Sequence, residues 1–300
     1  MIQLSGEKQI KNPARLFFIV AREANVAVLF RRGPSNWIQL IKWNLNKDYF
    51  EFGQWFHGRI DERKCDLNPD GSLLVYFASK YTKKQMQSAI SSTWTAISKP
   101  PYFTAIGLWP NGGTTYGGGG LFIDNHTLLL NHSIIEPHPN FQAKAIKIIP
   151  HTNDVKKECK SIFSSRLDRD GWKLIQEFKK LKNKYGNDAY NKTRQPEIRE
   201  RTEKKSKSII LMERSSNNDK YQAKFYLKQN EKIIEIHNGQ WADWDHKGRL
   251  IAAIDGKLFA SDSSDKKIKL ENLKLLLDTN DHEPTLLKAP GFATRLVCLF

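Results

Sequence analysis

The sequence contains few cysteines and no long hydrophobic run. Its three cysteines, Cys65, Cys159 and Cys298, lie far apart and form no CxxC pair, which argues against a disulfide framework or a cysteine-based zinc cluster. Isolated thiols are typical of a reducing compartment. No window approaches the roughly 18 apolar residues of a membrane span, and the apolar run at residues 16–20 lacks the cleavage site of a signal peptide. We therefore expect a cytoplasmic protein that does not associate with membranes.

The sequence also lacks the motifs of common enzyme classes. It has no GxSxG elbow, which presents the nucleophilic serine of α/β-hydrolases. The glycine run 117–120 is followed by the strand-like residues 121–123, without a Lys-Ser/Thr pair or a helical pattern, so it does not indicate a phosphate-binding loop. Glycines in this position favour a tight bend or a close approach of two backbone segments.

Three histidines in the middle of the chain are candidate metal ligands. His126, His132 and His138 recur every six residues. The ligands of zinc sites usually include pairs that are closer together in sequence, so this spacing does not make three imidazoles converge. We expect hydrogen-bonded or solvated histidines, and neither a metal ion nor a cofactor.

The net charge is strongly positive. The chain has 48 Lys and Arg against 32 Asp and Glu, a formal charge of +16. Such a charge creates a field that attracts nucleic acid, acidic proteins or anionic lipid, and it also keeps a protein soluble. The charge alone does not decide between a binding role and solubility.

Short runs of β-branched and aromatic residues, separated by turn residues, make up most of the chain. Hydrophobic residues account for 39% and aromatic residues for 11% of the sequence, which is enough for a packed core. The Pro-Asp-Gly sequence at 69–71 predicts a turn, because proline pre-sets its φ and glycine accepts a left-handed conformation. The predicted strands cover residues 15–20, 25–30, 37–44, 49–54, 72–77, 127–130, 172–175, 249–253 and 257–259.

The turns that precede these strands recur at regular spacing. Those at Ala24, Asp70, Asp124 and Asp170 are separated by 46, 54 and 46 residues. The next turn, at Asp245, follows after 75 residues because a charged insertion lies between. A period of about 40 to 50 residues with four strands per unit is typical of propeller blades, which hide their sheet faces by stacking around an axis.

Two of these turns carry a resemblance to a known repeat. Residues 68–74, Asn-Pro-Asp-Gly-Ser-Leu-Leu, and residues 245–250, Asp-His-Lys-Gly-Arg-Leu, resemble the inner hairpin of WD40-like and related β-propellers. The resemblance covers about two thirds of the chain and implies architecture only, because propellers serve as scaffolds, binding platforms and enzymes. We predict an all-β fold, a single β-propeller domain over residues 1–300 with about five blades, closed by a strand at 293–300. Four or six blades and a pair of β-sandwiches are the alternatives.

A charged segment at residues 176–208 interrupts the repeat. Within it, residues 179–207 contain eleven Lys or Arg and four Asp or Glu, a charge of +7. Phe178, Leu181 and Tyr185 have the i, i+3, i+7 spacing of a helix, and the periodicity fails beyond them. We predict a short helix followed by a mobile basic loop, which forms an insertion in the propeller.

Basic and aromatic residues alternate in the first third of the chain. Arginine and lysine neutralise phosphates, and exposed rings stack on unpaired bases, so the pattern indicates a binding surface. In the alternative, the tryptophans pack between blades and the arginines bond loop carbonyls or the carboxylates of Asp61 and Glu62. The predicted binding residues are Arg31, Arg32, Trp37, His57, Arg59, Arg63 and, on a proline-rich loop, Tyr102.

The leading functional hypothesis is a non-enzymatic platform in an intracellular assembly, which binds a protein partner through one rim of the propeller. The alternative is a nucleic-acid-binding module that uses the basic and aromatic surface. A third hypothesis is a carboxylate-dependent hydrolase, because propeller glycosidases gather their acids from separate blades. The candidate carboxylates of such an enzyme are Asp66, Asp124 and Glu136. The sequence leaves open the partner, the pathway and the oligomeric state.

Overall fold

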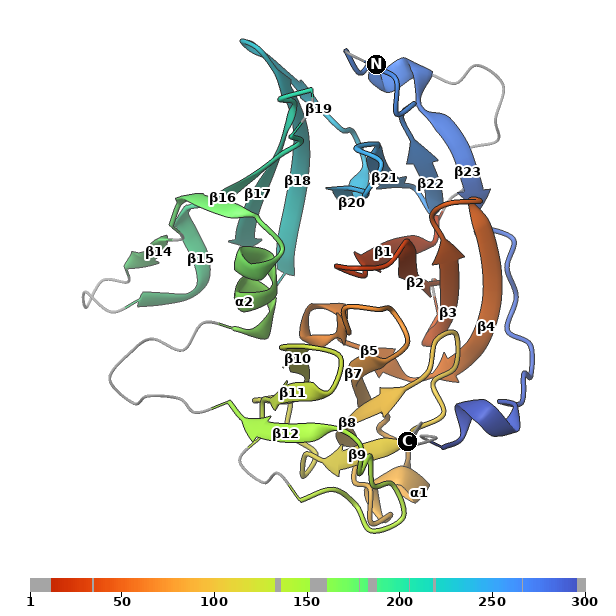
Figure 1. The fold of residues 1–300 in the computed structure, drawn as a ribbon. Coiled ribbons are helices and arrows are strands. Elements are labelled where there is room, and N and C mark those ends of the chain that lie inside the picture. The colour runs from red at the N-terminus through yellow and green to blue at the C-terminus, as the bar shows by residue number, and fades with distance from the viewer. Residues whose placement is uncertain are drawn as a thin grey trace. The chain divides into compact units, whose positions relative to one another are not determined.

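The fold was examined in a computed structural model, which describes residues 12–33, 35–132, 136–151, 161–177, 179–182, 188–204, 206–217, 220–265 and 267–295. Strands account for 45% of the chain and helices for 9%, so the prediction of an all-β protein is confirmed. The strands form five sheets, none of which closes into a barrel (Figure 1).

The chain divides into two compact units. Unit 1 comprises Met1–Leu16 and Leu167–Asp281, and unit 2 comprises Phe17–Arg166 and His282–Phe300. None of the helices in the described residues is both long and apolar enough to span a bilayer.

Unit 2 begins with a four-stranded antiparallel sheet whose order in space equals its order in the chain. Short turns join the strands, and the predicted strands of residues 15–54 are confirmed here. A bulge in the last pairing shifts the register between Gln39 and Ile41. The strands are β1 (Arg15–Val20), β2 (Val26–Arg32), β3 (Trp37–Asn44) and β4 (Tyr49–His57).

The second sheet of unit 2 is built around one fully buried strand, β7, which pairs with two short strands on one side and with β8 on the other. It begins two residues later than predicted, because the side chains of Asn68 and Asp70 accept hydrogen bonds from the N–H groups of Leu73 and Ser72 and so prolong the turn. The elements are β5 (Arg59–Ile60), η1 (Glu62–Lys64), β6 (Asp66–Leu67), β7 (Leu74–Ser79), α1 (Lys83–Met86), β8 (Thr93–Ser98) and β9 (Gly107–Pro110).

The third sheet of unit 2 is small and mixed. Its first pair of strands is antiparallel and its second pair is parallel. The strands are β10 (Gly120–Phe122), β11 (Thr127–Leu130), which matches its prediction, and β12 (Lys147–Pro150).

These three sheets pack as successive layers. One face of β7, with Leu74 and Tyr76, joins a core that also contains Phe30 of the first sheet. The other face, with Val75, joins a second core that contains Phe122 of the third sheet. Because alternate side chains enter two different cores, the strand is buried throughout and apolar up to its last residue, Ser79, as expected for a sheet covered on both faces.

Unit 1 contains a seven-stranded sheet and a four-stranded sheet. In the larger sheet, β16 and β18 flank β17, and in the smaller one the spatial order again follows the chain. The ring of Trp241 lies 6.1 Å from that of Trp172 and 5.6 Å from that of Phe225, which joins the two sheets through aromatic packing. The helix α2 (Ile162–Arg169) begins in unit 2 and ends in unit 1. The other elements of unit 1 are β13 (Lys173–Gln176), β14 (Lys179–Lys182), β15 (Asp188–Gln195), β16 (Glu197–Thr202), β17 (Ile209–Asn217), β18 (Lys220–Gln229), β19 (Lys232–Glu235), β20 (Gly239–Trp244), β21 (Leu250–Ile254), β22 (Lys257–Ala260), η2 (Leu270–Asn272) and β23 (Lys274–Asp278).

The segment 176–208 is not the predicted helix and basic loop. Its described residues supply β14, β15 and β16, while Phe178 and Tyr185 lie outside the described residues. Part of the charge is neutralised inside the sheet, where Glu197 binds the guanidinium groups of Arg199 and Arg214, each at 2.9 Å. Cross-strand ion pairs of this kind stabilise a strand without hydrophobic periodicity.

The predicted closing strand at 293–300 is absent from its described part. Residues Gly291–Ala293 form the 3-10 helix η3, Thr294 and Arg295 are not in a strand, and residues 296–300 lie outside the described residues.

Candidate partner-binding surface

Arg31 lies inside unit 2 and not on its surface. Its exposed fraction is 5%, and its guanidinium carbon lies 5.2 Å from the centre of the Trp55 ring. Burial lowers the pKa of Arg31. The residue supports the packing of the first sheet through this cation–π contact.

Arg32 points to the other face of β2 and is neutralised there. Its guanidinium donates to the carbonyl oxygen of Ile60 and pairs with the Glu62 carboxylate at 2.9 Å. The side chain is held between β2 and the η1 helix, so its charge is balanced within the unit.

Trp37 and His57 form a stacked pair at the end of the first sheet. They lie opposite each other in the register of β3 and β4, with ring centroids 4.6 Å apart and an interplanar angle of 20°. His57 is exposed and Trp37 is half-buried. The pair presents aromatic edges at the point where the chain leaves the first sheet for the second.

Arg59 follows this pair and is exposed. It opens β5, where it lies opposite Ser79, the last residue of β7. Among the described residues, its guanidinium makes no ion pair and no hydrogen bond. The strand register therefore places Arg59 beside the loop that begins at Lys80.

Arg63 and Tyr102 do not belong to the same surface. Arg63 is half-buried in η1, with its guanidinium carbon 5.6 Å from the centre of the Phe163 ring. Tyr102 is buried against Phe292, at a centroid distance of 6.2 Å, and burial raises its pKa. Tyr102 comes after the C-terminal end of β8, which pairs with the start of β7 at Leu74. Arg59 pairs with Ser79 at the opposite end of β7.

The sequence predicts a polar short helix or loop at residues 81–92 without a binding role; this is the loop between β7 and β8, which adjoins Arg59. The loop contains the short helix α1, whose N-terminus is capped by the Thr82 hydroxyl (3.3 Å to the Gln85 N–H), and the Gln85 side chain donates to the Ser91 carbonyl at 2.8 Å. The loop exposes Lys83 and Lys84, with Lys80 half-buried before them. It also exposes Tyr81 and Met86, at 55% and 61%.

A simple pattern of charge could have identified this loop. No aspartate or glutamate occurs between Asp70 and Asp124, while the same stretch contains Lys80, Lys83, Lys84 and Lys99. Within the described chain, the first three of these lysines form no ion pair. We call Arg59, Lys80, Lys83 and Lys84, together with the rings of Trp37, His57 and Tyr81, the basic surface. The helix α1, which carries Lys83 and Lys84, lies in the loop that precedes β8 (Figure 1).

The glycine run is a structural element, as predicted. Gly118 and Gly119 have positive φ, and a Cβ atom on them would collide with the Phe77 ring and the Lys64 backbone. The adjoining N–H of Gly119 donates to the Thr95 hydroxyl at 2.7 Å. The backbone therefore approaches its neighbours too closely for any side chain.

Three of the residues considered for chemistry, His132, Asp66 and Asp124, hold local structure. His132 is buried with its Nε2 atom 2.7 Å from the Thr95 hydroxyl, and burial lowers its pKa to about 4, which keeps it neutral. Asp66 accepts the N–H of Phe122 and Asp124 accepts that of His126. The described residues contain no group of three or more side chains arranged to hold a metal ion.

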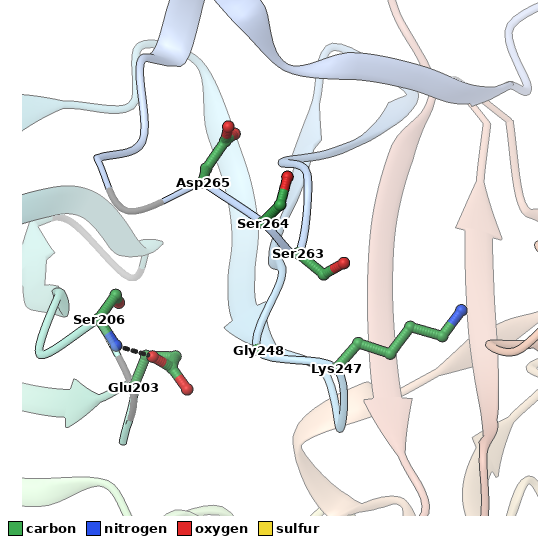
Figure 2. Close-up of a pocket in the computed structure, with 7 residues that line it drawn as sticks. All are labelled: Glu203, Ser206, Lys247, Gly248, Ser263, Ser264 and Asp265. Atoms are coloured by element: carbon green, nitrogen blue, oxygen red, sulfur yellow. Dashed lines mark hydrogen bonds between the residues drawn. The ribbon is translucent and has the colours of Figure 1, made fainter.

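Unit 1 contains a cavity of about 390 Å³. Its two carboxylates come from opposite sides and are engaged with backbone: Glu203 accepts the N–H of Ser206, and Asp265 accepts that of Asp262 (Figure 2). No pair of groups converges on one point of this cavity as a catalytic pair would. The lining residues are Glu203, Ser206, Lys247, Gly248, Ser263, Ser264 and Asp265.

The sequence matches no family model, and no curated protein matches it either.

Proposed function

We propose that the chain is a single β-propeller of about five blades and a non-enzymatic platform that binds a protein partner through the basic surface. Two features of the fold support the propeller. The β1–β4 and β20–β23 sheets are meanders in chain order, and β7 is buried on both faces between neighbouring sheets. Radial stacking of such sheets gives each one a neighbour on both sides, unlike a pair of sandwiches.

The observation that carries the binding role is the unbalanced charge of the basic surface. Arg32 is paired with Glu62, and Arg199 with Glu197. By contrast, Arg59, Lys83 and Lys84 are exposed and have no acidic partner among the described residues. A cluster of cations without counter-charges attracts acidic groups and speeds their association.

The side chains around these cations favour a protein partner over nucleic acid. Stacking on bases needs free ring faces, and His57 already covers one face of the Trp37 ring. Met86 is exposed beside the lysines, and flexible methionine side chains adapt to protein surfaces. Nucleic-acid binding remains the second candidate, because the same cations would neutralise phosphates.

The test is a capture experiment with charge-reversed variants. The triple variant K80E/K83E/K84E is compared with K47E/K144E/K147E, which changes the net charge equally at three exposed lysines elsewhere in unit 2. We expect the wild type and the control variant to capture defined proteins from the native host, and this capture should persist after nuclease treatment. The variant K80E/K83E/K84E should no longer capture these proteins. The proposal would be overturned if K80E/K83E/K84E captured the same proteins as the wild type, or if nuclease treatment abolished the capture.

A further inference from the structure

Three large apolar side chains are exposed on two adjoining loops of unit 2. Tyr81 and Met86 lie on the loop between β7 and β8, at 55% and 61% exposure, and Tyr116 lies after β9, at 88%. Single exposed apolar residues are common on protein surfaces and need no explanation. These three are notable because the cations of the basic surface lie among them.

Hydrogen bonds hold the two loops together. The N–H of Asn111 donates to the carbonyl oxygen of Thr93, where the loop between β7 and β8 ends, at 2.8 Å. The side-chain amide of Asn111 donates to the carbonyls of Thr114 and Tyr116, at 2.8 and 3.0 Å. The backbone that carries Tyr116 is therefore fixed next to the loop that carries Tyr81 and Met86.

The two loops carry no acidic residue of their own, and the nearby Asp61 pairs with Lys64 at 3.9 Å, whose ammonium group also bonds the carbonyls on both sides of Tyr116. The sequence between Asp70 and Asp124 has no carboxylate side chain, so Lys83 and Lys84 have none within reach along their own loop or along the loop of Tyr116. Rigid tyrosine rings provide contact area at a low cost in conformational entropy, and a methionine between them adapts its shape. The surface thus offers positive charge and apolar contact side by side.

We propose that the basic surface, with Tyr81, Met86 and Tyr116, binds an acidic peptide segment that carries a large apolar side chain. The carboxylates of the segment pair with Arg59, Lys83 and Lys84, and its apolar side chain packs against the three exposed residues. This inference rests on the proposed function and specifies the chemistry of the partner.

The cations alone do not distinguish the carboxylates of a peptide from the phosphates of a nucleic acid, because arginine and lysine bind both groups. The exposed apolar side chains of Tyr81, Met86 and Tyr116 favour the peptide. An acidic segment also gains from the apolar contact, which a phosphate backbone does not provide.

The test uses synthetic fluorescent peptides and the purified full chain. The first peptide alternates Glu and Asp around a Leu-Phe pair, the second has Ser in place of Leu-Phe, and the third has Gln in place of the acids. An oligothymidylate of similar length serves as the nucleic-acid probe. Binding is measured by fluorescence anisotropy at two salt concentrations, and circular dichroism checks that each variant is folded.

We expect the first peptide to bind most tightly and to lose about tenfold in affinity when either its acids or its apolar pair is replaced. The variant M86S/Y116S should weaken the first peptide about fivefold and leave the second peptide unchanged, because both residues are exposed anchors. K80E/K83E/K84E should abolish binding of both peptides, whereas K47E/K144E/K147E should retain it.

Equal binding of the first two peptides, tighter binding of oligothymidylate, or indifference to M86S/Y116S would overturn this inference. If no acidic peptide binds while the capture of host proteins still depends on Lys80, Lys83 and Lys84, the platform proposal stands and only the partner chemistry is wrong. If K80E/K83E/K84E also captures host proteins as well as the wild type does, both proposals fail.

Discussion

The ammonium group of Lys64 lies 4.4 Å from the centre of the Phe77 ring. The same group donates to the carbonyl oxygens of Thr115 and Gly117, at 2.6 and 2.7 Å, and burial lowers its pKa. This lysine therefore ties the glycine run to the second sheet. It contrasts with Lys83, which is exposed and has no such bonds in the part of the chain that the structure describes.

The variant Lys64→Met should lower the free energy of unfolding by about 2 kcal/mol, because it removes two charge-assisted hydrogen bonds. The matched variant Lys83→Met should change it by less than about 0.5 kcal/mol, as expected for an exposed side chain. Urea denaturation followed by circular dichroism measures both. Equal effects of the two substitutions would show that the contacts of Lys64 contribute nothing to stability.

The glycines of the run allow a second comparison of matched substitutions. Gly118 and Gly112 both have positive φ, +80° and +62°. A Cβ on Gly118 would collide with the Phe77 ring, whereas a Cβ on Gly112 meets nothing within 4 Å. We expect Gly112→Ala to cost about 1 kcal/mol for the left-handed backbone alone and Gly118→Ala at least about 2 kcal/mol more for the collision. Thermal unfolding of the two variants gives the comparison, and similar melting temperatures would contradict it.

The parts of the fold that local sequence determines were predictable. The strands of residues 15–54 follow from alternating β-branched and aromatic runs bounded by turn residues. The strands of the segment 176–208 were not predictable, because β16 is stabilised by ion pairs such as Glu197–Arg214, which join residues that are distant in sequence. A charged sequence of this kind has no hydrophobic pattern from which a strand can be inferred.

The binding surface was predictable only in part. Arg59 and the pair of Trp37 and His57 were identified from the basic and aromatic pattern. The same pattern included Arg31, which is buried against Trp55, since sequence alone does not show which face of β2 is covered. The loop of Lys83 was predicted as a polar short helix or loop but not as a binding element, because exposed lysines are common, although the absence of acids along it is visible in the sequence.

Arg199 of β16 tests whether the charged segment is part of the folded core. Its guanidinium is almost fully buried, pairs with Asp168 at 2.5 Å and Glu197 at 2.9 Å, and donates to the Trp172 carbonyl. Removing one member of a buried ionic network leaves the others uncompensated, so Arg199→Met should lower the free energy of unfolding by about 3 kcal/mol. Urea denaturation monitored by tryptophan fluorescence provides the measurement. A loss below about 0.5 kcal/mol would instead agree with the loop expected from sequence.

Asp243 of β20 gives unit 1 a distinctive dependence on pH. Its pKa is raised from the usual 3.8 to about 6, chiefly by burial and in part by the nearby Asp170, although Arg201 at 2.8 Å acts in the opposite direction. Because the folded-state pKa is raised, the contribution of this group to stability is full below about pH 3.8 and is lost as the pH rises through about 6.

The variant Asp243→Asn cannot ionise and should lack this loss. The difference in unfolding free energy between wild type and variant should therefore shift by about 3 kcal/mol between pH 3.5 and pH 7, to the disadvantage of the wild type at the higher pH. Urea denaturation at a series of pH values measures this difference and cancels the titration of the groups that both proteins share. A difference that stays constant over this range would mean that Asp243 keeps an ordinary pKa in the folded protein, because Arg201 then offsets its burial in full.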